Sequence, residues 1–168
     1  MTAPAPEPSP AARSRRARWV AVGAGLLLAW MLFAATCVVY RVEGQSMSPA
    51  LHPGEQVVAF RYGSVARGDL IVFRNPLDPR ELLIKRVHAL GGQTVALSQG
   101  KLVVDGVPAP LPTTFFDELP ARKVEPGHVF VLGDNQATSL DSRRLGTVDA
   151  SLVVGTVLCR LWPPSRVQ

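Results

Sequence analysis

Residues 42–55, VEGQSMSPALHPGE, decide how this chain is organised, because they separate one long apolar run from a series of short apolar segments. At the centre of the stretch, Ser46 stands between Gly44 and Pro49, a composition that favours a turn over a helix or a strand. A serine presented on a turn can act as a nucleophile. Polar turns of this kind also begin many ordinary domains, so the stretch alone does not assign a function.

The apolar run before this turn, residues 19–40, reads WVAVGAGLLLAWMLFAATCVVY and carries no charged side chain. At about 1.5 Å per residue it is long enough to span roughly 30 Å of hydrocarbon. Trp19 and Tyr40 stand at its two ends, where interfacial aromatic anchors are common. We therefore expect one transmembrane helix over residues 19–40.

Charge around the run predicts its orientation. Only Arg41 follows it directly, whereas four arginines precede it: Arg13, Arg15, Arg16 and Arg18. The positive-inside rule then places the N-terminus in the cytoplasm and the C-terminal domain outside, in a single-pass protein of the cytoplasmic membrane. The same arginines explain the net charge of +5, so we expect no nucleic-acid partner. Residues 1–18, rich in Ala, Pro and Ser before the arginines, are expected to be a disordered cytoplasmic tail.

Two alternatives for the apolar run are weaker. A cleaved secretory signal has a shorter core, and cleavage near Ala35 would leave Ser46 close to a new N-terminus. A lipoprotein signal ending at Cys37 would need a small residue where Thr36 stands. We therefore favour an uncleaved signal anchor.

The rest of the chain, residues 41–168, predicts a mainly β domain, a compact antiparallel β-sheet with a short cap loop. Short apolar runs alternate with Gly, Pro and Asp, and Asp105-Gly106 is a two-residue hairpin signal. Five prolines crowd the region between Pro108 and Pro126, so we expect that span to be an irregular cap or loop, within a short Pro-rich cap at about residues 98–126. The candidate strands are residues 56–60, 70–74, 82–88, 94–97, 101–104, 129–132 and 151–161.

A nucleophilic serine needs a base, and the sequence offers two kinds. His52, His88 and His128 could complete a Ser-His-Asp triad, although none has a recognisable nucleophile-elbow setting. The other candidate is Lys85, in the predicted strand 82–88. Strand alternation places Lys85 on one face with Leu83 and Val87, and Arg86 on the other face.

Apolar neighbours on its own face would desolvate Lys85 and favour the neutral amine that a general base requires. Arg86 would then point away as a structural or surface cation. The two cysteines, Cys37 and Cys159, form no CxxC or Cys/His cluster, so we expect no metal site and no disulfide. No cofactor is expected either.

Four motifs occur in an order that resembles bacterial type I signal peptidases, which are membrane-anchored Ser/Lys proteases. They are GQSMSP around Ser46, RGDLIVF at residues 67–73, IKRV at residues 84–87 and GDNQATSLDSR at residues 133–143. The resemblance covers roughly residues 19–163. It implies that Ser46 is the nucleophile and that Lys85 is the general base, and later the acid for the leaving amine.

The resemblance also implies supporting roles in the last motif. Ser139 would orient the lysine, Asp141 and Arg143 would form an ion pair, and Gly133, Asp134 and Asn135 would support the site.

This chain departs from the family pattern at two places. Gly44 stands where the family often has a serine that assists the oxyanion hole, so the hole would rely on the Ser46 backbone N–H. Gln136, Ala137 and Thr138 replace the commoner Arg-Asp-Asn of the last motif.

The implied substrates are signal-peptide-bearing preproteins, held at the lipid bilayer and cut after an Ala-x-Ala site. Extended peptides of this kind add to a strand edge, and their small side chains enter shallow apolar pockets. We expect Met47, Leu51, Leu83 and Ile84 to lie near those pockets. We also expect a monomer.

Two other functions fit parts of this pattern. A pilus-type or conjugative maturation peptidase would use the same serine and lysine on one dedicated substrate. A catalytically inactive, membrane-anchored β module would only bind peptides, and the presence of both Ser46 and Lys85 speaks against it.

Overall fold

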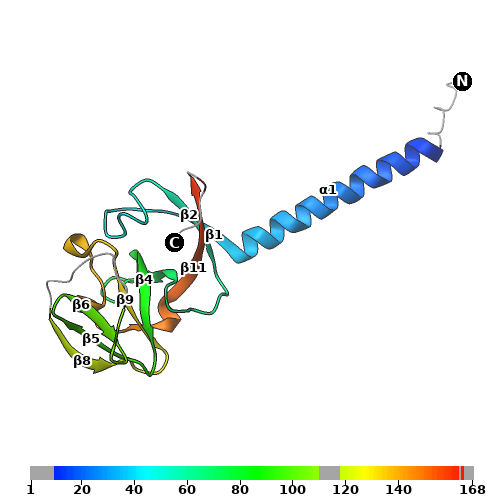
Figure 1. The fold of residues 1–168 in the computed structure, drawn as a ribbon. Helices are drawn as coiled ribbons and strands as arrows, with labels where there is room; N and C mark the ends of the chain where they lie inside the picture. The colour runs from blue at the N-terminus through cyan, green and yellow to red at the C-terminus, as the bar shows by residue number, and fades with distance from the viewer. Residues whose placement is uncertain (1–9, 110–117, 163, 165–168) are drawn as a thin grey trace, which may run out of the picture. The chain divides into compact units, whose positions relative to one another are not determined.

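The computed structural model describes residues 10–109, 118–162 and 164 and divides into two units at Thr36. Within the first unit the described residues form one helix, α1 (Pro10–Thr36), drawn in blue in Figure 1. Its Arg18–Thr36 portion has 19 residues and a mean hydropathy of 1.9, and none of it is buried within the protein. This portion of α1 is long and apolar enough to cross a membrane.

The boundaries of α1 differ from those predicted. The helix begins at Pro10, inside the expected disordered tail, and residues 1–9 lie outside the described part of the chain. It ends at Thr36 rather than Tyr40, because Cys37–Arg41 forms strand β1 and pairs antiparallel with β2 (Gln56–Phe60). Val38, Val39 and Tyr40 are apolar enough for a membrane span and also have high strand propensity, so hydropathy alone could not separate them from the helix.

The second unit consists of two antiparallel sheets. The larger sheet has the strand order β1-β2-β11-β3-β4-β9-β10, and the smaller has the order β7-β6-β5-β8. Besides β1 and β2, the larger sheet contains β3 (Leu70–Arg74), β4 (Leu82–Leu90), β9 (His128–Leu132), β10 (Val148–Asp149) and β11 (Val153–Trp162). The smaller contains β5 (Thr94–Ser98), β6 (Lys101–Val104), β7 (Val107–Pro108) and β8 (Leu119–Lys123). A mainly β, antiparallel domain is confirmed.

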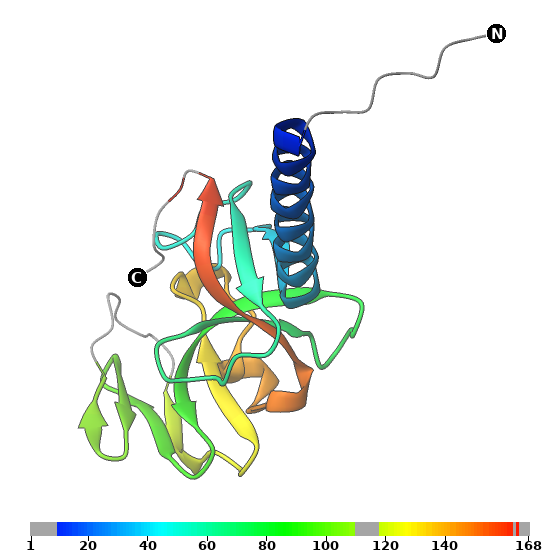
Figure 2. The same cartoon turned by 90° about the vertical axis from the view of Figure 1, so that its right-hand side faces the viewer.

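The long strand β11 lies between β2 and β3 and so connects the β1–β2 pair to the rest of the larger sheet. It pairs with β2 through one part of its length and with β3 through another, with register shifts in both pairings. Figure 2 shows β11, in red and orange, curving alongside β2. Gly155 permits this close passage, because a Cβ at that position would lie 3.1 Å from the Cβ of Ala59.

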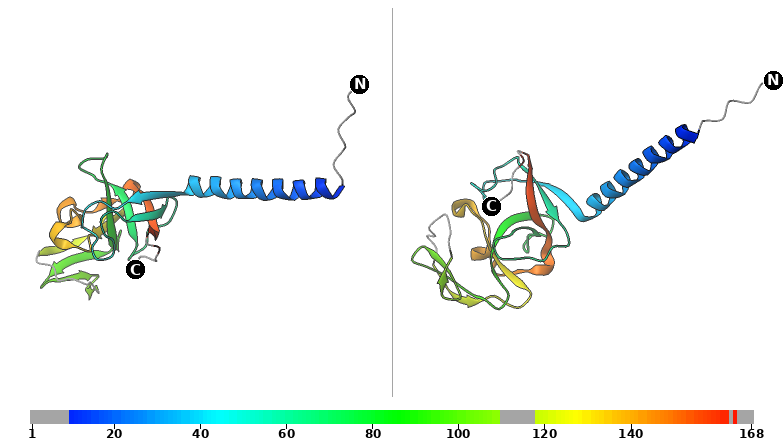
Figure 3. Two further views of the ribbon diagram at one scale, coloured as in Figure 1. Left: turned by 90° about the horizontal axis from the view of Figure 1, so that it is seen from above. Right: turned by 45° about the vertical axis from the view of Figure 1, so that its right-hand side comes forward.

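Alternate residues of β9 build two cores. Phe130 and Leu132 pack with residues of the smaller sheet such as Leu97, whereas Val129 and Val131 pack on the other side with β3. Figure 3 shows the smaller sheet, whose strands run from green to yellow-green, beside the larger one. Because both faces of β9 are covered, its sequence HVFVL is apolar at nearly every position rather than alternating.

Most predicted strands are present with small changes at their ends. Three-residue 3₁₀ segments are also present, η1 (Gln136–Thr138) and η2 (Ala150–Leu152), and η2 occupies the start of the predicted strand 151–161. The expectation of an irregular cap is wrong for β8, which pairs antiparallel with β5 although Pro120 lies within it. Proline is tolerated there because β8 is the last strand of its sheet. Residues 110–117 lie outside the described part of the chain.

Candidate active site

The turn that carries Ser46 is held by backbone hydrogen bonds between its two ends and by buried side chains near its centre. Val42 N donates to Glu55 O at 2.8 Å, and Gly54 N donates to Val42 O at 2.9 Å, so the two ends of the stretch lie together. Met47 and Leu51 are 1% and 0% exposed and pack into one core cluster. These contacts hold the backbone on both sides of Ser46 in a fixed position.

Lys85 lies in the middle of β4, opposite Ile71 of β3. Only 2% of Lys85 is exposed. Its Nζ donates to Ser46 Oγ at 2.8 Å and to Ile84 O at 2.9 Å. The structure therefore brings together the two residues that the sequence predicts as nucleophile and base.

Burial changes the ionisation of Lys85. Desolvation lowers the pKa of its amine to about 8, and the carboxylates of Asp141, Glu81 and Asp134 partly offset this effect. A much larger fraction of the amine is therefore neutral near physiological pH than in a solvated lysine. This is the protonation state that can accept a proton from Ser46.

Asp141 and Arg143 form the predicted ion pair. Arg143 Nε and Nη2 lie 2.9 and 3.0 Å from the two oxygens of Asp141, whose side chain is fully buried. Asp141 also accepts from Gly133 N and caps the short helix α2 (Ser142–Leu145). Burial opposes the ionisation of Asp141, but these hydrogen bonds outweigh it and hold the pKa of the carboxyl below its ordinary value.

A second buried ion pair was not foreseen from the sequence. Arg86 donates to both oxygens of Asp134 at 2.9 and 2.8 Å, and to Gly68 O at 3.1 Å. Arg86 is thus a structural cation that links β4 to residues 133–135 and to residues 67–69. The available signal was the alternation of Lys85 and Arg86 on opposite faces of β4, together with the Gly-Asp pairs Gly68-Asp69 and Gly133-Asp134 in the sequence.

Gly133 lies between Ser46 and Ser139. A Cβ on Gly133 would lie 2.6 Å from Ser46 O and 2.6 Å from the Cβ of Ser139, and it would also collide with Ser139 Oγ. Asn135 N donates to Ser46 O at 3.0 Å, which joins the last motif to the nucleophile turn. Gly133 and Asn135 therefore support the site through the backbone.

Ser139 is 7% exposed and lies in the same region. Its hydroxyl is close enough to Asp141 to help lower the pKa of that carboxyl, but it makes no hydrogen bond of good geometry with any described residue. The structure shows no hydrogen bond between Ser139 and Lys85, so the orienting role of Ser139 stays a prediction.

Gly44 has a positive φ of 74°, and a Cβ there would meet nothing within 4 Å. Glycine suits this backbone conformation better than serine does. A side chain at position 44 would therefore meet open space.

Ser46 and Lys85 lie in a groove of about 380 Å³. Three of the predicted pocket residues, Met47, Leu83 and Ile84, line it. Leu51 does not, because its side chain is directed into the core. The groove runs between two chain segments, residues 40–43 on one side and residues 80–85 on the other.

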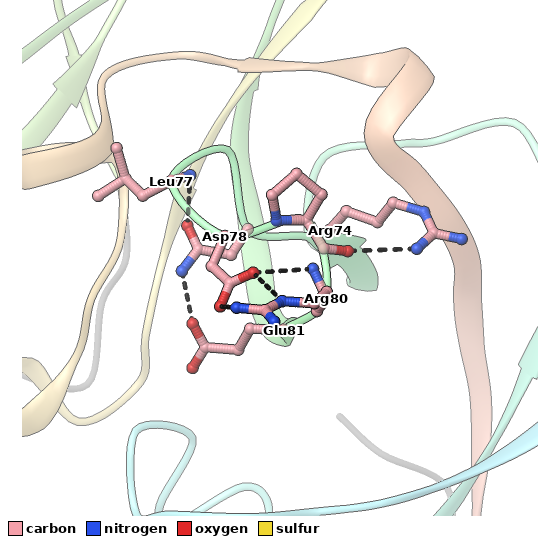
Figure 4. A network of polar contacts seen from close by, with 7 residues as sticks. Arg74, Leu77, Asp78, Arg80 and Glu81 are labelled. Carbon is pink, nitrogen blue, oxygen red and sulfur yellow. Dashed lines mark hydrogen bonds and ion pairs between the residues drawn. The ribbon is translucent and has the colours of Figure 1, made fainter.

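One wall of the groove comes from the β3–β4 loop, which sequence analysis did not single out. Asn75, 3% exposed, organises this loop by accepting from Leu77 N and donating to Glu81 at 2.5 Å (Figure 4). Arg80 pairs with Asp78 within the loop. Glu81 thereby becomes an acidic residue of the groove that holds the catalytic candidates.

The histidines do not take part in this arrangement. His52 is exposed, and His128 lies near Glu125. His88 is buried, and desolvation lowers the pKa of its imidazole to about 4. None of the three lines the groove that contains Ser46 among the described residues. The geometry therefore favours Lys85 over a histidine as the base.

A serine hydroxyl bonded to a desolvated lysine, in a groove beside strand β4, defines a Ser/Lys type of serine hydrolase. The family model for signal peptidase, peptidase S26, matches residues 16–162. The chain belongs to this family, and it is a serine endopeptidase.

Several curated relatives share most of the chain. Signal peptidase I of Mycobacterium tuberculosis is 30% identical over 226 residues, covering 95% of this chain and 77% of that one. Signal peptidase I of Bacillus caldolyticus is 33% identical and covers 80% and 90%. The mitochondrial ATP-independent inner membrane protease subunit 1a of Arabidopsis thaliana is 36% identical and covers 73% and 69%.

A solved structure agrees with these relatives. Signal peptidase I from Enterococcus faecalis superposes with a TM-score of 0.50 at 26% identity, covering 55% of this chain and 96% of that one. Together the comparisons favour a signal peptidase over a pilus-type maturation peptidase.

Proposed function

We propose that this protein removes N-terminal signal peptides from exported preproteins at the membrane, with Ser46 as the nucleophile and Lys85 as the general base. The observation that carries the assignment of these roles is the 2.8 Å hydrogen bond between Lys85 Nζ and Ser46 Oγ. A solvated lysine would be almost wholly protonated, but burial lowers the pKa of this one to about 8.

In the first half of the reaction the neutral amine of Lys85 takes the proton of the Ser46 hydroxyl. Ser46 Oγ attacks the carbonyl carbon of the scissile peptide bond and forms a tetrahedral oxyanion. The Lys85 ammonium then protonates the leaving amine as the C–N bond breaks, which leaves an acyl ester on Ser46. Ile84 O, 2.9 Å from Nζ, holds the amine in place during both proton transfers.

In the second half, neutral Lys85 deprotonates a water molecule that attacks the ester. The second tetrahedral species collapses, Ser46 Oγ regains its proton from Lys85, and the signal peptide leaves with a free carboxylate. Each half of the cycle thus returns Lys85 to the neutral amine with which it began.

The oxyanion needs hydrogen-bond donors, and we assign the Ser46 backbone N–H to this role. The 3.0 Å bond from Asn135 N to Ser46 O restrains the backbone that carries this donor. Because Gly44 offers no hydroxyl, a water molecule in the open space beside it would complete the hole.

The Asp141 carboxylate raises the pKa of Lys85 and so stabilises the ammonium that forms when Lys85 takes the Ser46 proton, while Arg143 keeps Asp141 ionised and fixed. We assign Ser139 an orienting role toward the lysine. The support for this is that its hydroxyl is buried, makes no hydrogen bond of good geometry with any described residue and lies across Gly133 from Ser46.

The groove fits an extended peptide with small side chains. The apolar part of its lining, Met47, Leu83 and Ile84, suits alanine, and the adjacent residues of β4 offer a strand for the substrate to join. We assign the enzyme a preference for Ala-x-Ala sites, because small side chains are the ones that shallow apolar pockets admit without overpacking.

The substrate is expected to meet the enzyme at the membrane. Ten residues separate Thr36, the end of the apolar helix, from Ser46 (46 − 36), which limits the chain between them to at most about 35 Å. The four arginines before the span assign the N-terminus to the cytoplasmic side of the cytoplasmic membrane and residues 37–168 to the outside.

Cleavage of a preprotein with an Ala-x-Ala site by the purified full-length protein in detergent tests this proposal. The wild type should release the signal peptide, and Ser46→Ala should not. Ser48→Ala is the matched control in the same turn, because its hydroxyl makes only a 3.4 Å contact to Leu51 O, and it should remain active.

Two results would count against the proposal. Cleavage by Ser46→Ala would show that another residue is the nucleophile. Cleavage of one preprotein but not of a second, unrelated one with the same Ala-x-Ala site would favour a dedicated maturation peptidase.

A further inference from the structure

Glu81, at the end of the β3–β4 loop, shares the groove with the two residues that carry the reaction. It lies four positions before Lys85, so strand alternation places it on the same face of the chain as Leu83 and Lys85. All three residues line the groove that contains Ser46. The Glu81 carboxylate and the reacting amine therefore belong to one space, although no hydrogen bond joins them within the described part of the chain.

A buried amide holds this carboxylate in place. Asn75 is 3% exposed, and its Nδ2 donates to Glu81 Oε2 at 2.5 Å (Figure 4). The backbone closes the same loop, because Asn75 N donates to Glu81 O and Glu81 N donates to Asp78 O, both at 2.9 Å. An exposed glutamate is ordinarily free to move, whereas Glu81 presents its charge to the groove from a fixed position.

The bonded partner of Glu81 differs from those of the other carboxylates near Lys85. Three carboxylates raise the pKa of Lys85, and two of them, Asp141 and Asp134, are each bonded to an arginine. The partner of Glu81 is the neutral amide of Asn75, and Glu81 forms no ion pair with any residue in the described ranges. Its negative charge is therefore not offset by a bonded cation.

The remaining charges of the groove are arranged in pairs. Arg80, next to Glu81 in the sequence, donates through Nε and Nη2 to the two oxygens of Asp78. On the opposite wall Arg41 and Glu43 contribute one charge of each sign. The charges that act on Lys85 are instead those of the three carboxylates.

We propose that the Glu81 carboxylate, held in the groove by Asn75, stabilises the Lys85 ammonium that forms when Ser46 gives up its proton. Glu81 is then a positioning residue that acts through Lys85, and it helps to set the pH range in which the enzyme works. The inference rests on the proposed function, since it assumes that Lys85 is the base.

The pH profile of preprotein cleavage tests the proposal. Glu81→Gln removes the charge but keeps an oxygen that can accept from Asn75 Nδ2. Without the carboxylate the pKa of Lys85 falls, so a larger fraction of the amine is neutral at neutral pH. The measured quantity is kcat/KM at neutral pH divided by its alkaline plateau, with the full-length protein in detergent at low salt. This ratio cancels any effect of the substitution on peptide binding that does not depend on pH.

We expect the ratio to rise roughly twofold in Glu81→Gln, the change that follows from the loss of a unit charge about 10 Å away in a largely aqueous medium. The rise should shrink at high salt, because Glu81 is exposed and its field is screened. Glu125→Gln is the matched control. Glu125 is an exposed glutamate outside the groove, so its loss changes the net charge equally and should leave the ratio at the wild-type value.

A second variant tests the part played by Asn75. Asn75→Ala frees the carboxylate, so the ratio should change in the same direction as in Glu81→Gln. In the presence of Glu81→Gln, Asn75→Ala should change the ratio no further, since Asn75 acts only through Glu81. If Asn75→Ala does not fold, the profile of Glu81→Gln alone decides the proposal.

Two results overturn the inference while the proposed function stands. One is a ratio in Glu81→Gln equal to that of the wild type, and the other is an equal rise in Glu125→Gln. Cleavage that persists in Lys85→Arg would instead overturn the assignment of Lys85 as the base, and the inference with it.

Discussion

Lys85 Nζ and Ser46 Oγ lie 2.8 Å apart although the two residues are separated by 39 positions in the chain. The contact requires a lysine that is almost completely removed from solvent. Burial of an ammonium group opposes folding. The burial that makes Lys85 a base therefore also destabilises the folded protein.

Replacement of Lys85 by methionine should separate these two effects. Lys85→Met should abolish cleavage and leave the folded protein at least as stable at neutral pH. Methionine has a side chain of similar length to lysine but brings no charge into the buried site. The pKa of Lys85 falls from 10.5 to about 8 on folding. The cost of burying its charge is therefore complete below about pH 8 and disappears as the pH rises toward 10.5.

Urea unfolding in detergent measures this difference. As the pH rises from about 8 to 10.5, the free energy of unfolding of the wild type should increase by about 3 kcal/mol relative to that of Lys85→Met. A variant that is several kcal/mol less stable than the wild type at neutral pH would contradict the explanation.

Asp141 should contribute strongly to stability. Asp141→Asn leaves Arg143 without its buried partner, and the loss of one member of a buried pair costs about 3 kcal/mol or more. Asp78→Asn, which breaks the exposed pair with Arg80, serves as the control and should change the free energy of unfolding little.

The same pair predicts acid sensitivity. Folding lowers the pKa of Asp141, so its contribution is present at neutral pH and is lost as the pH falls through the lowered value. Thermal unfolding followed from neutral to acidic pH should show a smaller loss of stability in Asp141→Asn than in the wild type. Equal losses would assign the acid sensitivity to other carboxyl groups.

Gly133→Ala should inactivate the enzyme through the backbone. The added methyl group would meet Ser46 O and Ser139, and overpacking of this kind costs about 1–3 kcal/mol while displacing the nucleophile. Gly25→Ala, in a part of α1 where a Cβ meets nothing within 4 Å, is the control and should keep full activity. Wild-type kcat in Gly133→Ala would show that the turn can move without harm.

Ser139→Ala should lower activity without abolishing it. Loss of a group that only orients a catalytic residue typically reduces the rate by about 10–100-fold, whereas Ser46→Ala removes the reaction. The kcat of the two variants on one preprotein measures the difference. Full activity of Ser139→Ala would show that this hydroxyl has no role in orienting Lys85.

Much of the β domain was predictable because its strands are short, apolar and bounded by Gly, Pro and Asp. The boundary at Thr36 was not, since Cys37–Arg41 satisfies the hydropathy of a span and its pairing with β2 depends on tertiary structure. Strand β8 was missed for a different reason, because Pro120 and the prolines near it in the sequence argued against a strand, although an edge strand tolerates proline.

In the site, too, local sequence patterns predicted some residues, whereas contacts that depend on tertiary structure were missed. Strand alternation was enough to place Lys85 among apolar neighbours, and the motif spacing was enough to choose Ser46. The bond between Arg86 and Asp134 joins residues 48 positions apart, and no local pattern predicts such a partner. Leu51 was expected in the pocket because it follows Ser46 closely, but the direction of its side chain depends on how the turn folds back onto the core.

The pH dependence of kcat/KM for preprotein cleavage tests the central claim most directly. If neutral Lys85 is the base, kcat/KM should rise with an apparent pKa of about 8, and Lys85→Arg should have no measurable activity at any pH because guanidinium stays protonated. An activity that persists in Lys85→Arg and disappears when His52, His88 or His128 is replaced would contradict the Ser/Lys mechanism.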